Sequence, residues 1–192
     1  YGVADAIRRT ASVRLSGIEL GDQEPWLRIT SDDLAAAGVE AFSTNPAMTR
    51  AIIADAAVAT GSVEIHRGAA VLDLLRDAGR VTGVVAKRGD AELVFGARLV
   101  VDGGNSIVRT RLGIPMTLSA FPFDFVTAMI PRWPLPPARV RGFLRPKGFG
   151  EDIPAVIFIP WPGSEGALLM PLPADRAEWL FEQPAKTFWS AL

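Results

Sequence analysis

The residues best suited to chemistry form one short stretch, in which an acid and two glycines follow an apolar run. The run Arg98–Val101 is apolar after its first residue, which is typical of a strand buried on both faces of a parallel sheet. The segment 102–106, Asp-Gly-Gly-Asn-Ser, comes directly after it, and a helix is predicted over 107–112. Because ligands of open α/β sheets bind beyond the carboxyl ends of the strands, this turn is the first candidate for a binding site.

Each residue type in this turn suits part of a nucleotide. A glycine such as Gly103 lets a ligand approach the backbone, and the start of a helix favours a phosphate. Asp102 can accept a hydrogen bond from a ribose hydroxyl, and Arg109 can pair with a phosphate or brace the turn. The same residues also fit a purely structural turn, in which Asn105 or Ser106 caps the helix. The residues alone leave both interpretations open.

The composition excludes most other kinds of catalytic or metal site. The chain has 192 residues, with 20 basic and 21 acidic side chains, one histidine and no cysteine. Without cysteine there is no thiol nucleophile or thiolate metal site, and the single His66 argues against a catalytic triad or a multi-histidine metal centre. We therefore predict no metal and name no side chain as a catalytic acid or base. Any difficult chemical step is expected to belong to a bound cofactor.

Charge and hydropathy limit the partners and the location. A formal net charge of −1 excludes a generally basic nucleic-acid-binding protein, and no apolar run approaches the ~18 residues that a membrane span needs. The chain begins at Tyr1 without the charged and apolar regions of a signal peptide, which together with the absence of cysteine predicts a cytoplasmic location. Both ends, the last at 188–192, lack capping or turn signals and are interpreted as truncations.

One helix and one small sheet are predicted ahead of the turn. Asn45 is a good N-cap and a proline follows it, so a helix is predicted over 46–60, ended by Gly61. Apolar and polar residues then alternate, and turn residues at 77–79 and 88–90 separate three strands. We expect these strands to form an antiparallel meander.

The prolines divide the chain into two structural regimes. Of the 15 prolines, all but Pro25 and Pro46 lie from Pro115 onward, where strands and loops alternate before a final helix over 174–181. The later strands are predicted at 123–130, 140–144, 155–160 and 166–170, and the segment 131–137 is too rich in proline for a central strand. The sequence thus predicts a mixed α/β fold, with a first part over 1–114 and a mostly antiparallel sheet over 115–192. The segment 10–40 belongs to the first part in this division, and packing on the later sheet is the alternative for it.

The turn and its surroundings resemble a known family. The pattern Asp-Gly-x-x-Ser-x-x-Arg over 102–109, with Leu-Gly-Ile after it, resembles the second flavin motif of the group A flavoprotein monooxygenases, the para-hydroxybenzoate-hydroxylase-like enzymes. The upstream order is also similar, with an arginine-bearing helix at Arg50, then 61–65 (GSVEI), 68–71 (GAAV) and 79–84 (GRVTGV). The resemblance extends over residues 40–115.

The resemblance implies FAD as the cofactor and NADH or NADPH as the reductant. It places Arg50 at the flavin pyrophosphate or ribose and Val71 against the adenine. It places Asp102 and Gly103 near the flavin ribose and pyrophosphate, with Arg109 supporting their loop. The first part of the chain then belongs to a Rossmann-like FAD-binding domain, and the later sheet to the substrate-binding side. Without the resemblance, Arg50 fits a solvated helix arginine and Val71 a core strand residue.

The implied function is that of an NAD(P)H-dependent monooxygenase, which hydroxylates an aromatic or polyketide-like small molecule through a flavin hydroperoxide. A related flavin halogenase or an isoprenoid-type reductase is an alternative, because these enzymes share the same middle region. A third alternative is a truncated, non-enzymatic domain that does not hold flavin. The family's Gly-x-Gly-x-x-Gly and Gly-Asp motifs are absent, and the bulky Val100-Val101 stands where the family has small residues. The 192 residues alone are therefore expected to be inactive.

Two clusters of side chains in the second part each fit either a functional or a purely structural interpretation. Basic residues without an intervening acid can attract an anionic substrate or a nicotinamide phosphate, or can form a solvated strand face. They are Arg132, Arg139, Arg141, Arg145 and Lys147. Aromatic residues, some at period-two spacing, line an apolar substrate pocket or fill a core. They are Phe121, Phe123, Phe125, Phe143, Phe158 and Trp161.

Overall fold

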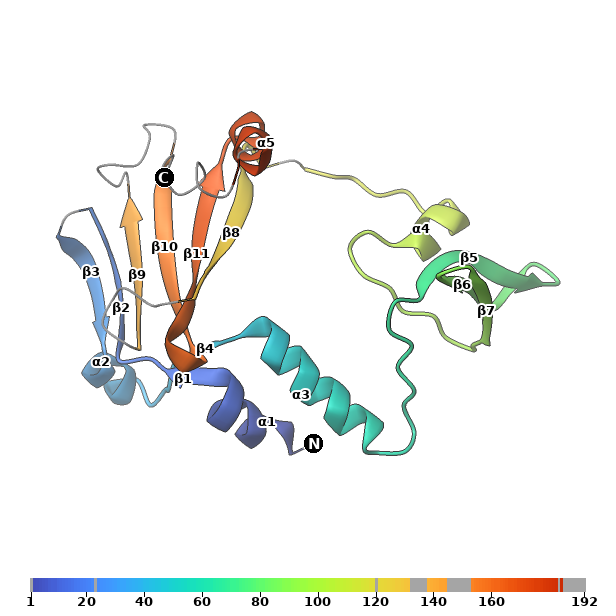
Figure 1. Cartoon of the computed structure of the whole chain (residues 1–192), viewed down its shortest axis with the longest axis horizontal. Helices are drawn as coiled ribbons and strands as arrows, with labels where there is room; N and C mark the ends of the chain where they lie inside the picture. Colours follow the sequence, from blue (N-terminus) through green and yellow to red (C-terminus); the bar gives the residue numbers. More distant parts are fainter. Residues whose placement is uncertain are drawn as a thin grey trace. The chain divides into compact units, whose positions relative to one another are not determined.

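The chain folds into two compact units, which are described separately (Figure 1). The first unit takes in residues 1–60 and 121–192, and the second takes in 61–120. No helix in the described part of the chain is long and apolar enough to cross a membrane. The computed structural model describes residues 2–22, 24–119, 121–131, 138–144, 153–182 and 184.

A six-stranded sheet forms the centre of the first unit, and its strands come from both ends of the chain. The strands are β2 (Gly17–Gly21), β3 (Pro25–Thr30), β8 (Asp124–Ile130), β9 (Arg139–Leu144), β10 (Ala155–Trp161) and β11 (Glu165–Leu172). Their order is β3-β2-β9-β10-β11-β8 (Figure 1). All neighbours are antiparallel except β2 and β9, which run parallel. A 3-10 turn, η2 (Pro162–Ser164), joins β10 to β11.

One face of this sheet carries the core of the first unit. Alternate side chains of a strand share a face, so Leu168, Met170 and Leu172 of β11 are buried together. Helix α5 (Ala174–Glu182) follows β11 and adds two buried side chains to the same cluster. The cluster comprises Val126, Ile153, Val156, Leu168, Met170, Leu172, Ala177 and Leu180.

Short helices and a two-stranded ladder make up the N-terminal part of this unit. They are α1 (Val3–Ala6), the π-helical η1 (Ile7–Ala11), β1 (Ser12–Arg14), α2 (Ser31–Ala36), β4 (Phe42–Thr44) and α3 (Pro46–Val58). The predicted cap of α3 is confirmed, because the side-chain oxygen of Asn45 accepts hydrogen bonds from the amides of Ala47 and Met48 at 2.9 and 3.2 Å. None of the helix's own residues is buried.

The second unit is the predicted meander followed by one short helix. Its elements are β5 (Ala70–Asp77), β6 (Arg80–Arg88), β7 (Ala91–Gly96) and α4 (Ile107–Leu112). The strands pair antiparallel in the order β5-β6-β7. The two tight turns use positive φ angles, at Ala78 (45°) and Gly79 (79°) in the first and at Gly89 (59°) in the second. Helix α4 ends at Leu112 with Gly113 as its C-cap, as predicted, and it packs against β5.

The predicted mixed fold and the later strands are confirmed, whereas the buried strand at Arg98–Val101 is wrong. This segment is irregular, and Leu99 and Val101 are 79% and 83% exposed. A strand inside a parallel sheet needs a hydrogen-bonded neighbour on each side, and no strand of the described residues pairs with this one. The predictions for 132–137 and 188–192 concern residues outside the described part.

Candidate functional site

Asp102 and the start of α4 hold each other in place. Ser106 is the N-cap of the helix, and its hydroxyl oxygen accepts a hydrogen bond from the amide of Arg109 at 3.0 Å. The carboxylate of Asp102 accepts from the amide of Gly103 at 2.7 Å and from that of Val108 at 3.5 Å. The bond from Gly103 lowers the pKa of Asp102 below its ordinary value of 3.8. Asp102 is therefore ionised at neutral pH and acts only as an acceptor.

The glycines that follow Asp102 leave their backbone open. A Cβ atom at Gly103 or Gly104 would meet nothing within 4 Å. The guanidinium of Arg109 donates to the carbonyl oxygen of Gly104 at 2.6 Å and so braces the loop from α4. Within the described residues, the amides of Gly104 and Asn105 donate to no acceptor, which leaves both free to contact a ligand.

A second arginine fastens α4 to the meander. A terminal guanidinium nitrogen of Arg111 donates to the carbonyl oxygen of Leu72 at 3.0 Å, and its Nε lies 3.3 Å from the carboxylate of Asp73. In return, Arg76 donates to the carbonyl oxygen of Arg111 at 2.6 Å. Together these contacts fix the helix that carries Arg109 to β5. Sequence analysis missed them, because the partners lie 35 and 39 positions apart and no local pattern marks them.

Replacing Arg111 by Gln should loosen this attachment without unfolding the meander. The variant loses the hydrogen bonds to Leu72 and the ion pair with Asp73. Both interactions lie at the surface, so their loss leaves the core of the meander unchanged. One net hydrogen bond of about 1 kcal/mol corresponds to roughly fivefold faster hydrogen exchange of the α4 amides. Arg88→Gln, at an exposed end of β6, is the matched control and should leave α4 unchanged. Equal α4 exchange in the two variants would contradict the role of Arg111.

Four of the five predicted site residues lie in the second unit, and one does not. Val71 is on β5 and is 38% exposed. Its neighbour Leu72 accepts the hydrogen bond from Arg111. Asp102, Gly103 and Arg109 share the loop and the start of α4. Arg50 is on α3 in the first unit, where it is exposed and forms no ion pair with any described residue. The structure therefore brings Asp102, Gly103 and Arg109 together within the second unit.

Comparison with known proteins now decides the family. A family model described as the FAD binding domain matches residues 1–173, which include the loop at Asp102 and the whole six-stranded sheet. The chain belongs to this FAD-binding domain family. The match confirms the flavoprotein family, with FAD as its cofactor, that the motif predicted. No sequence among the curated proteins matches the domain.

Solved structures share the fold of this FAD-binding domain at low sequence identity. PqsL of P. aeruginosa, solved in complex with 2-aminobenzoylacetate, matches with a TM-score of 0.66 and 20% identity over 93% of this chain and 48% of its own. The p-nitrophenol 4-monooxygenase PnpA of Pseudomonas putida DLL-E4 matches with a TM-score of 0.70 and 15% identity, over 98% and 48%. CmlS, a flavin-dependent halogenase, matches with a TM-score of 0.69 and 19% identity, over 99% and 35%. The chain thus spans about half the length of these proteins or less.

The exposed segment before Asp102 changes what supports the loop of the FAD-binding domain. The sequence predicted that a buried strand would deliver Asp102 to the edge of a sheet, and that support is absent from this structure. The loop is instead held locally, by the cap at Ser106 and by the bond from Arg109 to Gly104. Its geometry therefore depends on α4 and on the attachment of α4 to β5.

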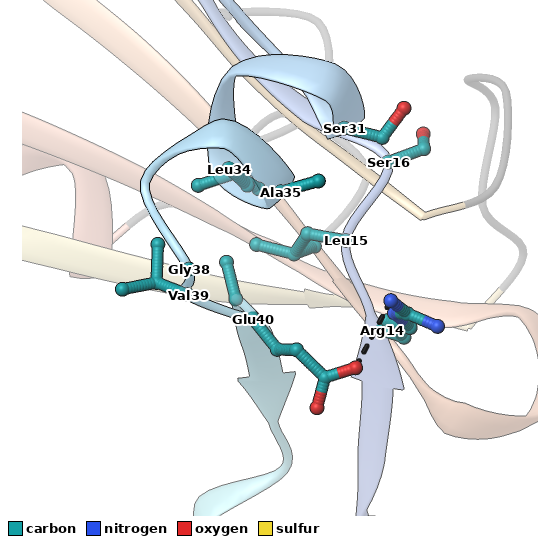
Figure 2. A pocket seen from close by; sticks show the side chains of 10 residues that line it. Arg14, Leu15, Ser16, Ser31, Leu34, Ala35, Gly38, Val39 and Glu40 are labelled. Atoms are coloured by element: carbon teal, nitrogen blue, oxygen red, sulfur yellow. Dashed lines mark ion pairs between the residues drawn. The ribbon is translucent and has the colours of Figure 1, made fainter.

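A cavity of about 480 Å³ in the first unit is a feature that sequence analysis missed. Figure 2 shows Leu15 between α2 and the ion pair of Arg14 with Glu40, whose atoms are 2.9 Å apart. Both charged side chains are mostly exposed and neutralise each other, so neither is left to select a ligand. The cavity is lined by Arg14, Leu15, Ser16, Ser31, Leu34, Ala35, Gly38, Val39, Glu40 and Ala41. We assign it no function.

Proposed function

We propose that the loop 102–105 binds the ribose and pyrophosphate of FAD. The open backbone at Gly103 and Gly104 and the ionised Asp102 carry this assignment. Asp102 would accept a hydrogen bond from a ribose hydroxyl, and the amides of Gly104 and Asn105 would donate to phosphate oxygens. Arg109 holds the loop in the conformation that presents these groups.

The adjoining residues are assigned lesser roles in the same proposal. Val71 would contact the adenine with the exposed part of its side chain, because it lies on β5, the strand to which Arg111 fastens α4. Arg50 is proposed to bind the pyrophosphate because of the family resemblance, and its exposed side chain, which forms no ion pair in the described part of the chain, is available for this role. When FAD is bound, the redox chemistry is supplied by the flavin, while the protein positions it and excludes water.

The protein that contains this domain is proposed to be an NAD(P)H-dependent monooxygenase acting on a small aromatic or polyketide-like substrate. The fold shared with a p-nitrophenol 4-monooxygenase and with PqsL, bound to 2-aminobenzoylacetate, supports this class. The sheet face opposite the buried core exposes Phe125 and Met129, 60% and 63%, as an apolar surface that suits such a substrate. The absence of cysteine supports a cytoplasmic location.

A flavin-dependent halogenase is the second candidate, because CmlS shares the fold over nearly the whole chain. The two candidates differ in what the reaction consumes. A monooxygenase converts its substrate without halide, whereas a halogenase requires chloride or bromide and incorporates it. Product masses with and without halide, measured on the protein that carries this domain, separate the two.

The binding proposal is tested by titrating FAD into the 15N-labelled chain and following amide chemical shifts. We expect weak binding, with the largest shifts at Gly103, Gly104 and Asn105. Asp102→Ala should weaken the affinity about tenfold, which is what the loss of one hydrogen bond to a charged group implies. Asp90→Ala is the matched control, since Asp90 is an exposed acid in a turn of the same unit. Equal affinities of the two variants, shifts confined to other segments, or no shifts at millimolar FAD would each overturn the assignment.

A further inference from the structure

A buried glutamate lies at the centre of an arginine cluster in the six-stranded sheet. Glu19, on β2, is 4% exposed and is the only buried charged side chain among the described residues. Its carboxylate lies 3.0 Å from Nε of Arg28 and 2.9 Å from a terminal nitrogen of Arg139. Nε of Arg141 is 3.8 Å from the other carboxylate oxygen. We call these four residues the Glu19 cluster.

The register of three neighbouring strands brings the Glu19 cluster together. Glu19 lies opposite Arg28 on β3 and opposite Arg141 on β9. Arg139 is two residues before Arg141, so it lies on the same face. On β2, Gly17 and Gly21 flank Glu19 on this face, and a Cβ at either position would overlap the backbone of β3. Glu19 is therefore the only side chain that β2 presents here.

The charges of the Glu19 cluster do not balance. Three guanidinium groups and one carboxylate leave a formal charge of +2, and no other acid of the described residues lies within ion-pair distance of these arginines. The arginine side chains remain 57%, 41% and 31% exposed for Arg28, Arg139 and Arg141. Each guanidinium has five N–H donors, of which Glu19 occupies few, so several remain directed to solvent.

An aromatic pair, whose Phe158 packs against the buried core, adjoins the cluster. The guanidinium of Arg141 stacks over the ring of Phe143, with 4.7 Å between its central carbon and the ring centroid. Phe143 in turn contacts Phe158 edge to face, with ring centroids 5.8 Å apart. Arg141 is therefore held between Glu19 and an aromatic pair, which fixes the plane of its donors.

We propose that the Glu19 cluster binds an oxyanion, the carboxylate or phosphate group of a small molecule. Planar, pre-oriented guanidinium groups bind such groups through paired hydrogen bonds. Glu19 aligns the arginines and competes with the ligand for them, so it sets the affinity. The site lies in the first unit and needs no flavin.

The test measures the binding of sodium benzoate, inorganic phosphate and neutral benzamide to the whole chain by calorimetry. Benzoate should bind more tightly than benzamide, and its affinity should fall as salt is raised. Arg141→Gln should weaken benzoate binding about tenfold, and Glu19→Gln should strengthen it about tenfold, because the competing charge is gone. Arg176→Gln is the matched control, since Arg176 stacks on Trp179 at 4.0 Å and forms no ion pair in the described part of the chain. It should change nothing.

The effect of Glu19→Gln separates a ligand site from a structural ion-pair cluster. A structural cluster predicts no stronger binding in this variant, and that result in a folded protein would overturn the proposal. If the variant does not fold, Arg28→Gln and Arg139→Gln replace it, and each must weaken benzoate binding for the proposal to stand. Equal affinities for benzoate and benzamide would also overturn it. Tighter binding of phosphate than of benzoate would support the oxyanion site and show that it prefers a phosphate group to a carboxylate.

Discussion

Replacing Met170 by Ala is expected to lower the free energy of unfolding of the first unit by about 2–5 kcal/mol. Met170 is fully buried in the cluster formed by β8, β10, β11 and α5. Truncation removes apolar contacts and leaves a cavity that the surrounding strands fill only in part, because a paired sheet resists collapse. Urea denaturation followed by tryptophan fluorescence measures the change, since Trp161 and Trp179 both belong to this unit.

Met129→Ala is the matched control for this substitution. Met129 lies on β8, next to β11, but it projects from the opposite face and is 63% exposed. Surface truncations of this kind change stability by about 0.5 kcal/mol or less. Similar losses in the two variants would contradict the assignment of the core to one face of the sheet. They would instead indicate that both faces are covered in the folded protein.

The local signals in the sequence predicted local structure well. Asn45 with Pro46 marked the start of α3, and Ser106 and Gly113 marked the two ends of α4, because capping depends on neighbours within four residues. The turns at Gly79 and Gly89 marked the meander, since only a few residue types tolerate positive φ. The flavin motif is also local, and its capping bonds form within the segment 102–109.

Contacts between distant segments could not be predicted in the same way. The parallel pairing of β2 with β9 brings Glu19 beside Arg141, although more than a hundred residues separate them in the sequence. Neither strand has a local sequence pattern that predicts which strand it pairs with. The Arg111 attachment was missed for the same reason. The basic stretch was known from the sequence, but Arg132, Arg145 and Lys147 lie outside the described residues, and only the register shows that Arg139 and Arg141 face Glu19.

The apolar run before Asp102 shows what periodicity does and does not establish. Leu99 and Val101 predicted a buried strand, yet both are exposed. Burial of an apolar segment is favourable, but an apolar sequence does not by itself provide the neighbouring strands that burial in a sheet requires. Asp102 keeps its carboxylate contacts because they come from Gly103 and Val108 and not from a sheet edge. The binding loop and the run before it are therefore separable features of the sequence.

Gly83→Ala should destabilise the second unit by about 3 kcal/mol, at the upper end of what overpacking costs. Gly83 lies in the middle of β6, where a Cβ would overlap the carbonyl oxygen of Phe95 on β7 and approach Leu75 on β5 to 3.0 Å. The carbonyl belongs to the backbone of a paired strand, so it cannot move without breaking the β6–β7 ladder. Hydrogen exchange should become faster in all three strands, and FAD binding at the loop should weaken because β5 holds α4.

Gly96→Ala is a control matched to this substitution as closely as the chain allows. Gly96 is the cross-strand partner of Gly83, and a Cβ there would meet nothing within 4 Å. Its replacement should leave stability within about 0.5 kcal/mol, because an exposed alanine fits extended backbone. Both variants lose one strand glycine, so the difference between them isolates the overlap at Phe95 from any general effect of glycine. Equal hydrogen exchange in the two variants would show that β7 does not pair with β6 in this register.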